Sequence, residues 1–167
     1  MMNRQKNWIR LVPWLLVLLW MGVIFYFSQE NGEQSAGTSE RVICFLLTRF
    51  DPGFLDLTAK EQTLRIRAWS TVVRKMAHFT LFGVMGLLSF GAFSVVLPPR
   101  RAFWAALGLG MLQGILDEVH QLFVPGRACE IRDMAIDTAG VALGVLVMLL
   151  LFSLVKRKKE PKTGEAQ

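Results

Sequence analysis

The chain has 167 residues, of which 53% are hydrophobic and 19% are charged, and its mean hydropathy is +0.40. A soluble domain of this length is about 45–50% apolar and about 25% charged, so the composition argues against an ordinary soluble domain. The net charge of +6 does not indicate nucleic-acid binding. Its basic residues flank apolar segments, where they are typical of membrane topology signals.

Four apolar segments of about 20 residues are long enough to cross a bilayer. They are 8–27, 76–97, 102–124 and 134–155. We therefore predict an all-α integral membrane domain over 1–155, a bundle of four transmembrane helices, followed by a basic cytoplasmic tail over 156–167. The third segment is the least apolar, because its last turns carry Asp117, Glu118 and His120. The first is expected to be a retained anchor, since no small-residue cleavage site follows it.

The basic residues are unevenly divided between the two sides of this predicted topology. The N-terminus, the 98–101 turn and the tail together carry ten basic and two acidic residues, whereas the rest of the chain carries nine basic and eleven acidic residues. Cytoplasmic loops are enriched in Lys and Arg. We therefore expect a multi-pass protein of the plasma membrane, with both termini in the cytoplasm and with 28–75 and 125–133 outside.

The outer segment, 28–75, is too long for a plain connector. Its first part is polar and its second part, around 42–50, is apolar, which favours an amphipathic helix at the membrane interface. A turn follows at 51–53. Thr58, with Glu61 three residues later, has the pattern of a capping box, so we predict that a helix begins near Thr58 and runs into the second span.

The later connections are short. The 98–101 turn is Pro-Pro-Arg-Arg, which predicts a tight hairpin between the second and third spans. In the 123–131 connection, Pro125 and Gly126 suit the centre of a type II turn, with a positive φ at the glycine. Spans two, three and four should therefore pack as antiparallel neighbours, and small residues such as Gly140 and Gly144 permit close contact.

Polar residues gather at the outer ends of these three spans. Charge at membrane depth costs about 2.5–3.5 kcal/mol per group on insertion scales, so a convergence of this kind indicates a function. The residues are Lys75 and His78 on the second span, Asp117, Glu118, His120 and Gln121 on the third, and Asp133 and Asp137 on the fourth.

Three uses of this cluster stay open. In a structural plug, Arg127 and Arg132 would neutralise Asp133 and Glu118. In acid/base chemistry, neighbouring carboxylates have separated pKa values, and the candidate catalytic residues are Glu118, Asp133 and Asp137. In binding, basic groups hold a phosphate or carboxylate. The candidate ligand-binding residues are Lys75, His78, Asp117, His120, Gln121, Arg127 and Arg132.

No cofactor is indicated by the sequence, and no metal site is assigned. Asp, Glu and His do bind divalent metals, but the chain has no H-E-x-x-H pattern and no Cys/His spacing typical of zinc. The two cysteines, Cys44 and Cys129, both fall on the predicted outer side, and we expect unpaired thiols.

Three strings, KMAHFTLFGVMG at 75–86, DEVHQLFVPGR at 117–127 and RDMAIDTAGVALG at 132–144, resemble the VanZ-like family. FSQE at 27–30 is similar to the element that ends the first span in many members. The resemblance covers most of the chain outside the tail and the outer segment. It implies a small bacterial membrane protein of the cell envelope, whose namesake is linked to low-level resistance to the glycopeptide teicoplanin. It implies no mechanism.

Carried over position by position, the family pattern gives most weight to Glu118, Gln121, Asp133 and Asp137, because the namesake lacks equivalents of Asp117 and His120. The other positions that match the pattern are Lys75, His78, Arg127, Thr138 and Gly140.

The residues and the resemblance together predict an envelope protein that recognises a lipid-linked or glycopeptide-type ligand at the extracytoplasmic cluster. The expected partners are membrane lipids and a lipid-linked cell-wall precursor or glycopeptide, without nucleic acid. One alternative is an intramembrane hydrolase or transferase acting on a lipid headgroup, with Glu118 or Asp133 as general base and Arg127 stabilising anionic charge. Another is a structural helper subunit.

Overall fold

The computed structural model describes residues 2–159, with side chains for residue 8 and for 10–155. This part of the chain forms helices and no strand, so the all-α prediction is confirmed. The predicted basic tail has no described side chains, and 160–167 lie outside the described residues. The helices are α1 (Met2–Ser28), α2 (Gly32–Phe50), α3 (Ala59–Ser94), α4 (Pro99–Gln121) and α5 (Ile131–Lys159).

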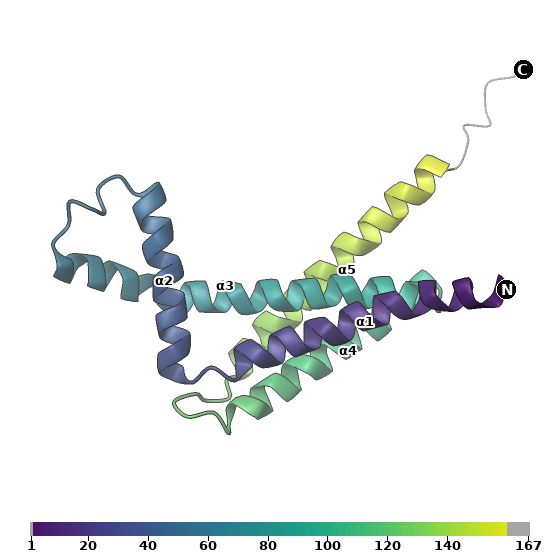
Figure 1. The fold of residues 1–167 in the computed structure, drawn as a ribbon, viewed down its shortest axis with the longest axis horizontal. Helices are drawn as coiled ribbons and strands as arrows, with labels where there is room; N and C mark the ends of the chain where they lie inside the picture. Colours follow the sequence, from purple (N-terminus) through teal and green to yellow (C-terminus); the bar gives the residue numbers. More distant parts are fainter. Residues whose placement is uncertain (1, 160–167) are drawn as a thin grey trace, which may run out of the picture.

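Helix α3 is the centre of the bundle and contacts each of the other four helices. Figure 1 shows α1 and α4 running along α3, whereas α5 crosses it and then diverges. Helix α2 stands across the bundle at the end where α1 and α4 finish. We call this the α2 end. The first residues of α1 and the last residues of α5 lie away from α2, at the opposite end of the bundle. The turn between α3 and α4 is also at that end.

Three of the helices in the described part of the chain are long and apolar enough to cross a membrane. They are α1 over Arg10–Ser28, α3 over Ala59–Ser94 and α5 over Ile131–Val155. The prediction of four such helices is wrong, because α4, which corresponds to the expected span 102–124, does not reach this apolarity. Its polar residues lower its average hydropathy, although the helix lies alongside the others.

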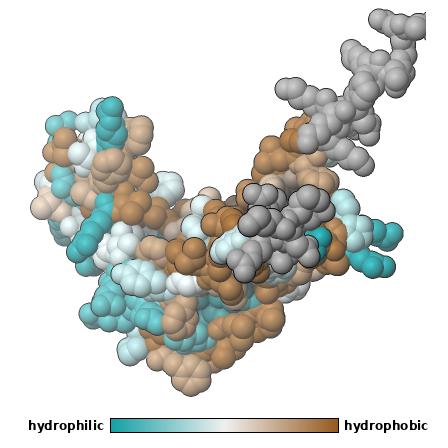
Figure 2. Space-filling view, turned by 45° about the vertical axis from the view of Figure 1, so that its right-hand side comes forward, coloured by the Kyte–Doolittle hydropathy of each residue, from teal (hydrophilic) through white to brown (hydrophobic). Residues whose placement is uncertain are grey.

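The side chains of α4 are distributed with the polar groups inside and the apolar groups outside. Gln113, Asp117, Glu118 and Gln121 are buried, whereas Leu112, Ile115, Leu116 and Val119 are exposed. This is the reverse of a helix at the surface of a soluble protein. Figure 2 likewise shows hydrophobic surface along much of the bundle.

Helix α2 begins earlier than the sequence predicts. The amphipathic helix of the outer segment was expected around 42–50, but α2 already starts at Gly32 and includes the polar stretch. The reason is a capping box: Asn31 Oδ1 accepts the Gln34 N–H at 2.8 Å, and Gln34 Oε1 accepts the Asn31 N–H at 3.1 Å. Ile43 on the inner face of α2 is buried.

The predicted start of α3 is confirmed. The Thr58 N–H donates to Glu61 Oε2 at 2.9 Å, and the Glu61 N–H donates to Thr58 Oγ1 at 3.4 Å. The helix then continues without a break into the second span. The predicted turn before α5 is also confirmed, because Gly126 has a φ of +74°, a conformation that favours glycine.

Close helix contacts depend on glycine. A Cβ at Gly144 of α5 would overlap the Gly83 carbonyl of α3 and lie 2.8 Å from its carbon. A Cβ at Gly110 of α4 would lie 2.5 Å from a methyl group of Val141. These contacts hold α5 against both α3 and α4, so they fix the depth at which the polar residues of the three helices meet.

We expect Gly144→Ala to destabilise the bundle, because the new methyl group meets backbone that cannot move aside. Overpacking of this kind costs about 1–3 kcal/mol. The control is Gly108→Ala, since a Cβ at that position has no neighbour within 4 Å and alanine favours a helix. The unfolding temperatures of both variants are measured in detergent, with circular dichroism as the signal. Equal stability of the two would contradict the role of the α3–α5 contact.

Candidate functional site

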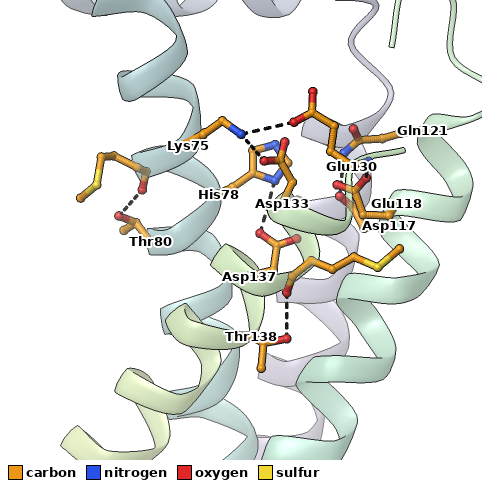
Figure 3. A network of polar contacts seen from close by, with 12 residues as sticks. Lys75, His78, Thr80, Asp117, Glu118, Gln121, Glu130, Asp133, Asp137 and Thr138 are labelled. Atoms are coloured by element: carbon orange, nitrogen blue, oxygen red, sulfur yellow. Dashed lines mark hydrogen bonds and ion pairs between the residues drawn. The ribbon is translucent and has the colours of Figure 1, made fainter. Parts of the chain in front are cut away.

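Polar side chains of α3, α4 and α5 meet at the α2 end of the bundle. Figure 3 shows them pointing toward one another from the three helices. The short connection 122–130 brings the end of α4 next to the start of α5, and α3 passes both at the level of Lys75 and His78. The convergence of three segments that the sequence predicts is therefore present in the fold.

Lys75 is the basic partner of the first turn of α5. Its Nζ contacts Asp133 Oδ1 closely and lies 3.4 Å from Glu130 Oε2. The side chains of Lys75 and Asp133 are about four-fifths buried, with 21% and 22% exposed. The expectation that Arg127 or Arg132 neutralises Asp133 is therefore wrong.

Glu118 of α4 is fully buried. Its Oε2 accepts the backbone N–H of Glu130 at 2.8 Å, just before α5 begins. A carboxylate at this place is favourable, because it satisfies a backbone donor and faces the positive end of the helix dipole. Its Oε1 has no hydrogen-bond partner, and no arginine forms an ion pair with it among the described residues.

A second group lies deeper and consists of His78, Asp117 and Asp137. Asp137 Oδ1 lies 3.6 Å from His78 Nδ1, and neither oxygen of this carboxylate has a hydrogen-bond partner. Asp117 Oδ2 accepts the Gln121 amide at 3.0 Å. One ligand-type atom from each of the three residues lies within 4.8 Å of the others. We call these three residues the buried triad.

Three predicted site residues lie away from the buried triad. His120 packs its ring against Phe25 of α1, with 4.9 Å between the ring centroids. Arg132 is exposed and lines neither of the two cavities described next. Arg127 is partly exposed, but its Nε is buried without a hydrogen-bond partner, and it faces these cavities.

Two of the cavities at the α2 end share three residues. An apolar cavity of about 640 Å³ lies between α2 and α3, and a polar cavity of about 260 Å³ lies between α3 and the 122–130 connection. Both are lined by Arg74, His78 and Arg127. Arg74 and Glu130 were not among the predicted site residues. Their only signal in the sequence is position, one turn before His78 and one residue before α5.

The connection 122–130 carries two groups with shifted pKa values, the Arg127 guanidinium and the Cys129 thiol. Burial, and then the nearby charge of Arg74, lower the pKa of Arg127, although an arginine stays protonated near neutral pH. Two cations thus face one site. Burial and the Glu118 carboxylate raise the pKa of the Cys129 thiol, which keeps it protonated near neutral pH. Cys129 and Cys44 are both free, as expected.

Comparison with known proteins gives one match. The family model VanZ/LLP1 matches residues 13–153. No curated protein and no solved structure matches the chain. The matched range contains every polar residue of the site, and it covers much more than half of the chain, so the protein belongs to the VanZ/LLP1 family.

Proposed function

We propose that this protein binds a lipid-linked, phosphate-bearing molecule of the cell envelope at the α2 end of the bundle. The observation that carries the proposal is the junction of the two cavities at Arg74, His78 and Arg127. An apolar cavity that opens next to a polar cavity with two arginines matches a ligand with a hydrocarbon chain and an anionic headgroup.

The apolar cavity suits a hydrocarbon chain. Its volume of about 640 Å³ is within the range of ligand pockets, about 300–1,000 Å³. The apolar side chains that line it come from both helices: Val42 and Leu46 of α2, and Val73, Met76 and Leu81 of α3.

The polar cavity suits the headgroup. Arginine presents several N–H donors in a plane and matches phosphate oxygens in a bidentate manner. Arg74 and Arg127 provide two such groups, and the buried Nε of Arg127 still lacks a partner. Glu130 and Asp133 line the same cavity and would accept hydrogen bonds from hydroxyl or amino groups of the headgroup.

Lipid-linked cell-wall precursors combine a long hydrocarbon chain, phosphate and polar substituents, so they fit this description. The resemblance to the VanZ-like family, whose namesake is linked to teicoplanin resistance, supports the same class. The protein would then contribute to glycopeptide resistance by holding a precursor or a bound glycopeptide at the outer surface. The hydrolase alternative has less support, because Glu118 lines neither cavity and Asp133 is paired with Lys75.

Replacing the shared arginines should weaken lipid binding. We expect Arg74→Gln and Arg127→Gln each to raise the Kd for polyprenyl phosphate by about tenfold or more, because a hydrogen bond to a charged group contributes about 1.5–3 kcal/mol. The matched control is Arg132→Gln, since Arg132 is exposed and lines neither cavity. Native mass spectrometry in detergent measures binding, with phosphatidylcholine as the reference lipid. An equal effect of all three variants would refute a specific headgroup site.

The proposal includes an orientation, with the α2 end outside and both termini in the cytoplasm. It is supported by the basic residues of the N-terminus, the 98–101 turn and the tail. An even number of crossings is then required, so α4 would cross within the bundle, with its polar side chains shielded by α3 and α5 rather than through its own apolarity.

Cysteine labelling tests this orientation. In a chain whose Cys44 and Cys129 are replaced by Ser, a cysteine introduced at Gln34 should react with a membrane-impermeant maleimide added to intact cells. A cysteine introduced at Lys158 should react only after the cells are lysed. Labelling at Lys158 from outside would place the two cavities on the cytoplasmic side and contradict recognition of a ligand at the outer surface.

Glu118→Gln separates a functional role from a structural one. The amide oxygen still accepts the Glu130 N–H, and the change removes one of several neighbouring buried carboxylates. We therefore expect the unfolding temperature of Glu118→Gln to stay the same or rise. Glu118→Ala leaves that N–H unpaired, so its free energy of unfolding should fall by about 1–3 kcal/mol. Thermal unfolding and lipid binding are measured together. A Glu118→Gln protein that melts early yet binds normally would show that the Glu118 carboxylate has a structural role only.

A further inference from the structure

We propose that the buried triad, His78, Asp117 and Asp137, binds a divalent cation of the first transition series, such as Zn²⁺ or Mn²⁺. The triad is contributed by three different helices, and its ligand-type atoms lie within 4.8 Å of one another. Figure 3 shows the Asp137 carboxylate below the His78 ring, with a dashed line between them.

The strongest support comes from Asp137. Its side chain is 99% buried, since only 1% of its surface is exposed, and both of its oxygens lack a hydrogen-bond partner. A buried carboxylate without a partner is costly, and buried charges are normally paired or coordinate metals. The atom that faces it, His78 Nδ1, lies 3.6 Å away and also lacks a hydrogen-bond partner.

The local charge balance points the same way. Asp117 is 4% exposed and Glu118, the next residue, is fully buried, so three carboxylates lie in a small volume. Lys75 is already held by Asp133 and Glu130, and Arg127, although its charge is close enough to act on His78, forms no ion pair with either aspartate of the triad among the described residues. A cation with two positive charges would neutralise both aspartates of the triad without removing a basic residue from another interaction.

The ligand types select the class of cation. Ca²⁺ and Mg²⁺ prefer oxygen ligands alone, whereas an imidazole together with carboxylates suits first-row divalent metals. Bonds from Zn²⁺ to nitrogen and oxygen are about 2.0–2.2 Å long, so ligand atoms lie about 3–4 Å apart in a formed site. Atoms within 4.8 Å reach that separation with small side-chain movements.

Two further features prepare the site. The Gln121 amide donates to Asp117 Oδ2 at 3.0 Å, which orients a ligand carboxylate in the way that outer partners of metal ligands do. Gly114 of α4 lies directly against Asp137, because a Cβ at that position would be in van der Waals contact with the Asp137 side chain. Three protein ligands leave coordination positions free, and one of them, His78, also lines the polar cavity together with Gln121, so the triad adjoins that cavity on one side.

The test uses the full chain, purified in detergent, stripped with a chelator and free of added lipid. Calorimetric titration with ZnCl₂ and electron paramagnetic resonance with MnCl₂ measure binding; Mn²⁺ is included because thiols such as Cys44 bind it poorly. We expect about one equivalent of cation, bound more tightly than Mg²⁺. Asp137→Asn and His78→Gln should each weaken binding by at least about tenfold, and Asp117→Asn serves if either of them fails to fold.

The matched control is Glu130→Gln, which removes a carboxylate of the same site that lies outside the triad, and it should bind the cation like the original chain. Arg127→Gln should also bind it normally, which separates this inference from the proposed lipid binding. The assignment would be overturned by any of three results. These are no saturable cation binding by the folded protein, tighter binding of Mg²⁺ than of Zn²⁺ and Mn²⁺, or a loss of cation affinity in Glu130→Gln equal to that in the triad variants.

Discussion

The burial of carboxylates inside an apolar bundle is the constraint on which the rest of the structure depends. Glu118 and Asp137 are at most 1% exposed, in a protein that otherwise presents apolar surface to its surroundings. Each such group is costly unless it is paired. One oxygen of Glu118 is satisfied by the backbone of α5, and Asp133 by Lys75, but Asp137 is left with a single distant imidazole.

Glycine packing makes this arrangement possible and also makes it rigid. The contact between Gly144 and Gly83 brings α5 to backbone distance from α3, so Asp137 and His78 lie at the same depth. On α4, Gly110 allows a similarly close approach, here to the side chain of Val141 of α5. Because the contact between α3 and α5 involves backbone, these two helices cannot separate without losing packing along their length.

Local rules were enough to predict the features that depend on neighbouring residues. The capping box at Thr58 and the glycine turn at Gly126 require only short-range geometry, and both are present. The meeting of the three helix ends followed from the shortness of the connections. The extent of α2 was missed because its start depends on Asn31 and Gln34, which the polar composition of that stretch concealed.

The partners within the site could not be predicted in the same way. Arg127 and Arg132 are near Asp133 in sequence, but Lys75, distant along the chain, is its partner, because helix rotation decides which side chains face each other. The composition of α4 does not reveal the environment of its side chains, because that environment depends on which face of the helix is turned inward. The cavities could not be predicted from the sequence, since they arise where α2 and the 122–130 connection lie against α3.

The position of His78 connects the two levels of the site. Its ring lines both cavities, and its Nδ1 faces Asp137. A change in the charge or orientation of this imidazole therefore alters the lining of both cavities. Conversely, a ligand next to His78 would change the surroundings of the Asp137 carboxylate. Lys75, one turn earlier on the same helix, fixes α3 to α5 through Asp133. The Lys75–Asp133 ion pair thus fixes the register between α3 and α5 that places Asp137 opposite His78.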